Sequence, residues 1–142
     1  INQVTATSDR LSGLPLGGRA IQVPDGPSNN YFLETFGRAD RDTPCSCEVS
    51  TSPTLSQALH LLNGENTNRK IEEGGRVTGW LTEGLSPIDA AQKIYVTCLS
   101  RLPTTAEQSA IADRLAASSD VDTELKDLLW AVLNSNEFLF NH

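Results

Sequence analysis

The sequence predicts a mainly α-helical domain: a small orthogonal bundle of about five or six helices, preceded by an irregular N-terminal arm, with little or no strand. Two observations lead to this fold class. From Ser52 onward, apolar residues recur at helical spacing, and several of these segments open with a serine or threonine cap. The 142 residues are enough to build a core without metal or disulfide staples.

Residues 1–30 are expected to form the irregular arm, because four glycines and three prolines exclude a long helix there. Only Arg19–Val23 has strand character. Ile1 and Val4 are compatible with the end of a helix that belongs to a preceding domain. Residues 31–142 are then expected to form a single helical domain.

Two helices are predicted in the first half of that domain. Tyr31–Phe36 carries an apolar face and is followed by Gly37, which suits a left-handed helix end. Ser52 and Pro53 start the second helix, whose apolar residues continue at helical spacing up to Gly64.

A polar helix over Glu65–Glu73 is expected to be anchored by Ile71 and broken at Gly74–Gly75. A further short turn, with Val77 and Trp80 inward, should end near Gly84. The Gly74–Gly75 pair lacks the preceding strand, the lysine and the hydroxyl of a nucleotide-binding loop, so it is interpreted as a helix break.

The three longest helices are predicted from Ser86 onward, and their short connections should make them neighbours. The first starts at Ser86 and ends at Pro103, the second starts with the capping box Thr104–Glu107, and the third follows Asp120. The stripe expected to be buried in the first is Ile88, Ala91, Tyr95, Cys98 and Leu102. The tail Phe138–Phe140 should fold back against the core.

The charge balance argues against several classes of partner. Eighteen acidic residues against eleven basic ones give a formal charge of −7, and the basic residues form no stripe. Such a chain repels nucleic acid and anionic membrane surfaces. No apolar run in the sequence is long enough to cross a bilayer.

Cys45 and Cys47 form the most distinctive chemical feature, in a segment that Pro44 keeps non-helical. Three states remain open for them: free thiols, a disulfide with each other, and metal ligation. In an extended segment their Cα atoms lie about 6 to 7 Å apart, at the upper limit of what a disulfide spans. A zinc site would have to recruit His60 and Cys98, although Cys98 fits better as a small buried residue.

Alternating charges between the cysteines and the first helix form a second candidate site. Arg38, Asp40, Arg41 and Asp42 fit a solvated or internally paired loop, and the alternative is an anion site on the two arginines.

Catalytic patterns are sparse. His60 and His142 are the only histidines, and His60 reads as a helix-surface or packing residue rather than a base. Glu72–Glu73 and Asp120–Asp122 lie in exposed contexts, which leaves glycosidase chemistry without support. Trp80 and Trp130 fit core packing.

The run Tyr31–Gly64, with Ala20–Gly26 before it and Leu128–His142 at the end, resembles the C-terminal domain of unknown function of planctomycete-type exported proteins that also carry a cytochrome c-like domain. The resemblance implies an exported protein of the periplasm or cell envelope, with haem held only in another domain, since no C-x-x-C-H occurs in this chain. The chain departs from the family at Cys45–Ser50, where the family pattern reads Cys-Glu-Cys-Glu-Arg-Ser.

Three functions follow as hypotheses. The first is a non-catalytic interaction or packing domain of such an exported cytochrome c-like protein, whose partners are the other domains of its parent and whose oligomeric state is open. The second is a redox or metal-binding site at Cys45 and Cys47. The third is a role in polysaccharide processing.

Overall fold

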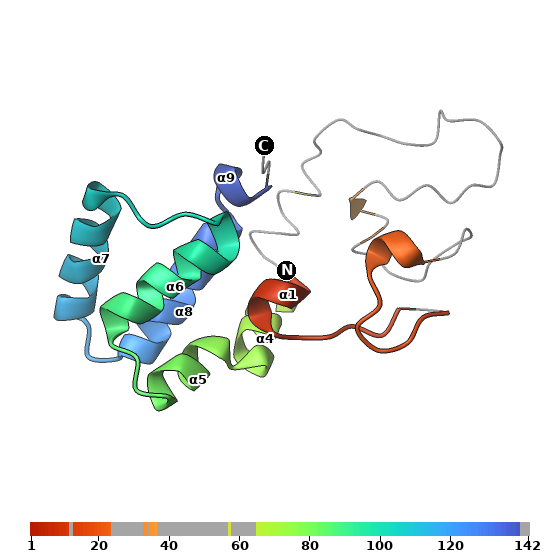
Figure 1. Cartoon of the computed structure of the whole chain (residues 1–142), viewed down its shortest axis with the longest axis horizontal. Coiled ribbons are helices and arrows are strands. Elements are labelled where there is room, and N and C mark those ends of the chain that lie inside the picture. Colours follow the sequence, from red (N-terminus) through yellow and green to blue (C-terminus); the bar gives the residue numbers. More distant parts are fainter. Residues whose placement is uncertain (12, 24–32, 34, 37–56, 58–64, 140–142) are drawn as a thin grey trace. The chain divides into compact units, whose positions relative to one another are not determined.

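The structure, a computed structural model, describes residues 1–11, 13–23, 33, 35–36, 57 and 65–139 (Figure 1). The chain divides into two compact units: the first joins Ile1–Thr7 with Glu65–His142, and the second is Ser8–Gly64. The predicted boundary after residue 30 falls outside the described residues and stays a prediction.

Helix accounts for 69% of the described residues and no strand occurs among them, which confirms the mainly α fold class. The helices of the first unit are α1 (Asn2–Thr5), α4 (Glu65–Gly74), α5 (Arg76–Thr82), α6 (Pro87–Leu99), α7 (Thr105–Ala117), α8 (Val121–Leu133) and α9 (Asn136–Leu139). Helices α6, α7 and α8 have 13 residues each and are the longest in the described part of the chain, as predicted.

In the second unit, the strand character expected for Arg19–Val23 is wrong. Residues Ala20–Gln22 form a short 3₁₀ helix, η1. The Arg19 N–H donates to Gln22 Oε1 at 2.8 Å, and the Val23 N–H donates to the Ala20 carbonyl at 3.2 Å. These local bonds satisfy backbone groups that a strand would have to pair with another strand.

The two helices predicted over Tyr31–Phe36 and Ser52–Gly64 fall almost wholly outside the described residues. One contact between these segments is described: Gln57 Nε2 donates a hydrogen bond of 3.0 Å to the Thr35 carbonyl.

The predicted start signals of the three long helices are confirmed. The Ser86 hydroxyl accepts from the Asp89 N–H at 3.2 Å, and Pro87 occupies the first turn. Thr104 and Glu107 form the reciprocal capping box of α7. Asp120 Oδ1 caps α8 by accepting from the Thr123 N–H at 3.2 Å. Each cap satisfies a backbone donor that the first helical turn leaves unpaired.

The predicted end of α6 and part of its buried stripe are wrong. Ser100 adopts a left-handed conformation with φ of 56°, and its N–H donates to the Val96 carbonyl, so the helix stops at Leu99. Leu102 therefore lies beyond the helix and is 61% exposed, and Ile88 in the first turn is 40% exposed. The buried positions are instead Ala90, Ala91, Ile94, Tyr95 and Cys98.

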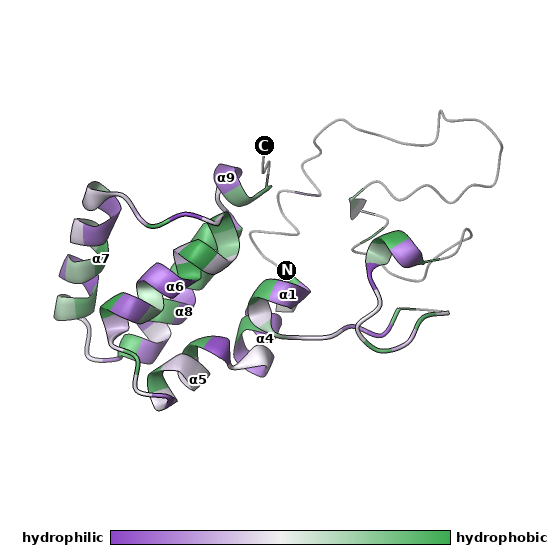
Figure 2. Cartoon of the chain, in the orientation of Figure 1, coloured by the Kyte–Doolittle hydropathy of each residue, from purple (hydrophilic) through white to green (hydrophobic). Residues whose placement is uncertain are grey.

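Helices α6 and α8 pack against each other at the centre of the first unit (Figure 1). Ile94 of α6 and Leu125 and Leu129 of α8 are at most 2% exposed. Burying a side chain of this size contributes about 1.5–3 kcal/mol, so this seam stabilises the unit substantially. Figure 2 shows polar and apolar residues distributed around each helix, as expected for amphipathic helices that share one core.

Helices α4 and α5 pack on α8, and the break between them is the one predicted at Gly74–Gly75. Gly75 has a left-handed φ of 56°, which a glycine adopts without strain. Ile71, Val77 and Trp80 are buried as expected.

The N-terminal helix α1 docks on α4 at Gly74. A Cβ atom added to Gly74 would lie only 1.7 Å from the Thr5 carbonyl oxygen, so only glycine permits this approach. Lys70 Nζ donates to Asn2 Oδ1 at 2.6 Å, and Thr5 is fully buried. These contacts join two segments that lie far apart in the sequence.

The tail folds back as predicted as far as it is described: Phe138 of α9 is partly buried and packs against the core. Phe140 and His142 lie outside the described residues. No helix in the described ranges combines the length and apolar character needed to cross a bilayer.

Candidate functional site

The site residues predicted from the sequence fall outside the described part of the chain. They are Cys45 and Cys47, the charged loop Arg38, Asp40, Arg41 and Asp42, and His60. The described residues contain no group of three or more histidine, cysteine, aspartate or glutamate side chains that could hold a metal ion. Because Cys45, Cys47 and His60 lie outside the described residues, the metal and disulfide hypotheses stay predictions.

Within the described residues, the candidate site is a groove between α7 and α8. Helix α7 is rich in alanine, and Ile111 is the only one of its residues that is buried. Helices α6 and α8 have the same length and bury five and four residues, so α7 lies more loosely on the bundle than they do. The floor of the groove is apolar and consists of Ile111, Leu115, Leu125, Leu128 and Ala131.

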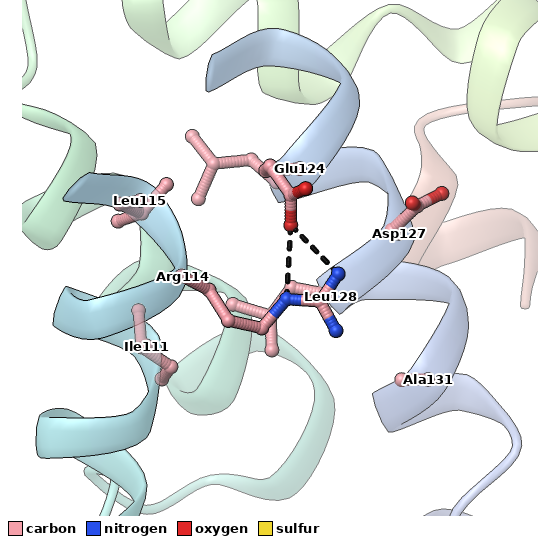
Figure 3. Close-up of a pocket in the computed structure, with 8 residues that line it drawn as sticks. Ile111, Arg114, Leu115, Glu124, Asp127, Leu128 and Ala131 are labelled. Atoms are coloured by element: carbon pink, nitrogen blue, oxygen red, sulfur yellow. Dashed lines mark hydrogen bonds and ion pairs between the residues drawn. The ribbon is translucent and has the colours of Figure 1, made fainter. Parts of the chain in front are cut away.

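Three charged residues complete the lining of the groove: Arg114, Glu124 and Asp127. Arg114 reaches from α7 to Glu124 on α8, with Nη2 and Nε at 2.9 and 3.0 Å from Oε2 (Figure 3). The Asp127 carboxylate points away from this ion pair (Figure 3) and is exposed. It has no hydrogen bond or ion pair with any other residue that the structure describes.

The size of the groove limits what it can bind. Its cavity volume is about 100 Å³. Pockets for small-molecule ligands usually span roughly 300–1,000 Å³, whereas a cavity of roughly 150 Å³ holds one benzene ring. The groove therefore has room for a single apolar side chain and is too small for a typical substrate or cofactor.

Helix α7 is held at its N-terminus by Arg101, which follows α6. Its guanidinium donates to Glu107 at 2.9 and 3.0 Å and to Glu137 of α9 at 2.6 and 2.7 Å. It also lies 5.3 Å from the centre of the Tyr95 ring. The hydrogen bonds from Arg101 and from the Thr104 backbone lower the pKa of Glu107 to about 2. This network fixes where α7 begins, and with it one wall of the groove.

A second charged cluster joins α4, α5 and α8. Lys126 Nζ lies 2.7 Å from Glu72 and 2.8 Å from Asp122, and the Thr78 hydroxyl donates to Asp122 at 2.7 Å. The hydrogen bond from Lys126 lowers the pKa of Asp122. The adjacent Asp120 caps α8, and its bonds to Thr123 lower its pKa as well.

The predicted pairs of carboxylates are therefore structural in this unit. Glu72 pairs with Lys126, Glu73 pairs with Arg69 at 2.8 Å, and Asp120 and Asp122 act as described above. Each described carboxyl group whose pKa is shifted has it shifted downward. A carboxylic acid that donates a proton in catalysis near neutral pH needs the opposite shift.

Cys98 and Trp80 occupy the core positions expected of them. Cys98 is 9% exposed, and burial raises the pKa of its thiol to about 11, which keeps it protonated and a poor nucleophile. Trp80 is 8% exposed, with Lys93 Nζ 4.9 Å and Arg76 Cζ 5.7 Å from its ring centre. Trp130 is partly buried against the same core.

No family model, curated protein or solved structure matches the chain. The resemblance to the C-terminal domain of exported cytochrome c-like proteins therefore stays a prediction.

The groove was not predicted from the sequence, although one signal for it exists. The only large apolar residues of α7 are Ile111 and Leu115, and alanines flank them. These side chains are too small to fill the space between α7 and α8. Ala131 on the facing helix removes further volume at the same place. The sequence alone does not show which face of α8 packs against α7. It therefore could not indicate that the small residues of α7 and Ala131 of α8 meet at the same groove.

Proposed function

We propose that this chain is a non-catalytic interaction domain, and that the α7/α8 groove is its docking surface. The observation that carries the proposal is the groove itself: an apolar hollow of about 100 Å³ between α7 and α8, bordered by charged side chains. An anchoring side chain in such a hollow, surrounded by a polar rim, is how many protein interfaces gain most of their affinity.

The chemistry of the surrounding residues supports this proposal. The carboxylates with lowered pKa serve as caps and ion-pair partners, and the Cys98 thiol is buried and protonated. None of these groups combines the exposure and the pKa that a nucleophile or a general acid requires.

The proposed context comes from the resemblance. The parent would be a large exported bacterial protein with a cytochrome c-like domain, and the partner would be another of its domains. The alternatives are a redox or metal site at Cys45 and Cys47, which lie outside the described residues, and a role in polysaccharide processing.

Elemental analysis and thiol alkylation of the purified chain test the proposal. We expect no stoichiometric metal, and no disulfide that exchanges rapidly with glutathione. One equivalent of zinc, or a Cys45–Cys47 bridge that cycles rapidly between oxidised and reduced forms, would show that the alternative is correct.

A further inference from the structure

We infer that the α7/α8 groove recognises a basic amphipathic segment, which places one apolar side chain in the hollow and a lysine or arginine beside Asp127. This inference rests on the proposed interaction function and adds the chemical class of the partner. The shape of the groove and the charges on α7 and α8 both support such a partner.

The shape calls for one apolar anchor. The hollow is lined by Ile111, Leu115 and Leu128, and its volume of about 100 Å³ matches a leucine or methionine side chain rather than a larger ring system. Such an anchor would replace water over the apolar floor, which favours binding in proportion to the apolar surface that it covers.

The charges call for a basic partner. Between Thr105 and Leu133 there are six acidic residues and only two basic ones, Arg114 and Lys126, a net charge of −4. Arg114 is paired with Glu124, and Lys126 is paired with Glu72 and Asp122. Both basic residues of this helical hairpin, which consists of α7 and α8, are therefore already paired. Neither is available to neutralise another carboxylate.

Asp127 is the residue that links the charge to the groove. It lines the hollow, is exposed and has no partner among the described residues. A lysine or arginine close to the anchoring side chain would form a charge-assisted hydrogen bond with it. The same field disfavours an acidic segment, and also a second copy of the chain, which would bring two hairpins of charge −4 together.

The binding test uses synthetic amphipathic helices as probes. One probe consists of leucine and lysine, and its matched counterpart carries the same leucines with glutamate in place of lysine. Binding to the ¹⁵N-labelled chain is measured by fluorescence anisotropy and by NMR chemical-shift changes. We expect the lysine probe to bind, to shift the amides around Ile111, Leu128 and Ala131, and to weaken as salt is added. The glutamate probe should not bind.

Because the net charge of −7 attracts any basic peptide, paired variants decide the result. Asp127→Lys and Glu83→Lys change the net charge equally, and Glu83 is exposed directly after α5 and does not line the groove. Ala131→Leu fills the hollow, whereas Ala116→Leu adds the same bulk at an exposed position of α7 that does not line it. We expect Asp127→Lys and Ala131→Leu to weaken binding roughly tenfold and each control to change it less than about twofold.

The outcomes separate this inference from the function on which it rests. Equal weakening by Asp127→Lys and Glu83→Lys would show that the attraction is non-specific, and shifts mapped away from α7 and α8 would show that the groove is not the site. Either result would overturn the inference that the partner is basic. Binding of the glutamate probe, or self-association of the chain through the groove, would also overturn it. The interaction function would then still be judged by the metal and thiol measurements above. Circular dichroism of each variant checks that the fold is retained.

Discussion

Replacing Gly74 with alanine is expected to separate α1 from the bundle. The added Cβ would lie 1.7 Å from the Thr5 carbonyl oxygen and 2.8 Å from the Thr5 carbonyl carbon. Both are backbone atoms and cannot rotate away, so α1 has to move by more than about 1 Å. Close-packed contacts do not survive such a displacement.

The size of the effect follows from what α1 contributes. Moving it exposes Val4, worth about 1.5–2 kcal/mol, and breaks the Lys70–Asn2 hydrogen bond, worth about 1.5 kcal/mol because the donor is charged. Alanine returns at most about 1 kcal/mol through its better helix propensity. The net loss for Gly74→Ala is therefore about 2 kcal/mol, or a fall in Tm of roughly 6 °C.

Gly79 provides the matched control. It lies inside α5, and a Cβ at this position would meet nothing within 4 Å. Gly79→Ala should therefore stabilise the chain by roughly 0.5–1 kcal/mol through helix propensity alone. Urea denaturation monitored by circular dichroism, together with calorimetry, measures both variants.

A truncation makes the test specific to α1. In a chain that lacks residues 1–7, Gly74→Ala has no backbone to collide with and should be neutral or slightly stabilising. An unchanged or higher Tm in the full chain would refute the close approach of α1 to α4. Destabilisation that persists after the truncation would refute Thr5 as its cause.

Three further predictions concern the tail, the Arg101 network and the core thiol. Phe138→Ala should lower the free energy of unfolding by about 2 kcal/mol, less than for a fully buried phenylalanine because the ring is only partly buried; an unchanged urea midpoint would mean that the tail does not pack. The folded-state pKa of Glu107, about 2, lies below its ordinary 4.5, so its stabilising effect is complete above about pH 4.5 and is lost as the pH falls towards 2. Tm measured against pH should accordingly fall less in this window for Glu107→Gln than for the unmodified chain, and parallel curves would contradict the network. Cys98 should react with iodoacetamide only after denaturation, because its thiol is buried and burial raises its pKa to about 11. Peptide mapping by mass spectrometry identifies the labelled cysteine. Rapid labelling of Cys98 in the native chain would show that its thiol is at the surface.

The sequence alone determined where the three long helices in the second half of the chain begin. Capping residues such as Ser86, Thr104 and Asp120 bind backbone groups within three residues of themselves. The helix starts therefore depend only on neighbouring residues and were predicted correctly. The same holds for the helix break at Gly75, where the backbone conformation itself favours glycine.

Which residues become buried was less predictable, because burial depends on what lies opposite. Helical spacing placed Ile88 in the α6 stripe, yet it is 40% exposed, and the fully buried Ile94 was not in the predicted set. The packing of α8 against α6 selects the face, and periodicity over a single helix cannot distinguish two adjoining apolar faces.

The groove and the docking of α1 were decided only by the tertiary structure. Gly74 packs against the Thr5 carbonyl, and Arg101 pairs with Glu137. The two residues of each pair lie far apart in the sequence. The hollow beside Asp127 exists because the small side chains of α7 meet Ala131 of α8. A cavity is the volume that two surfaces fail to fill, so no single segment of the sequence contains it.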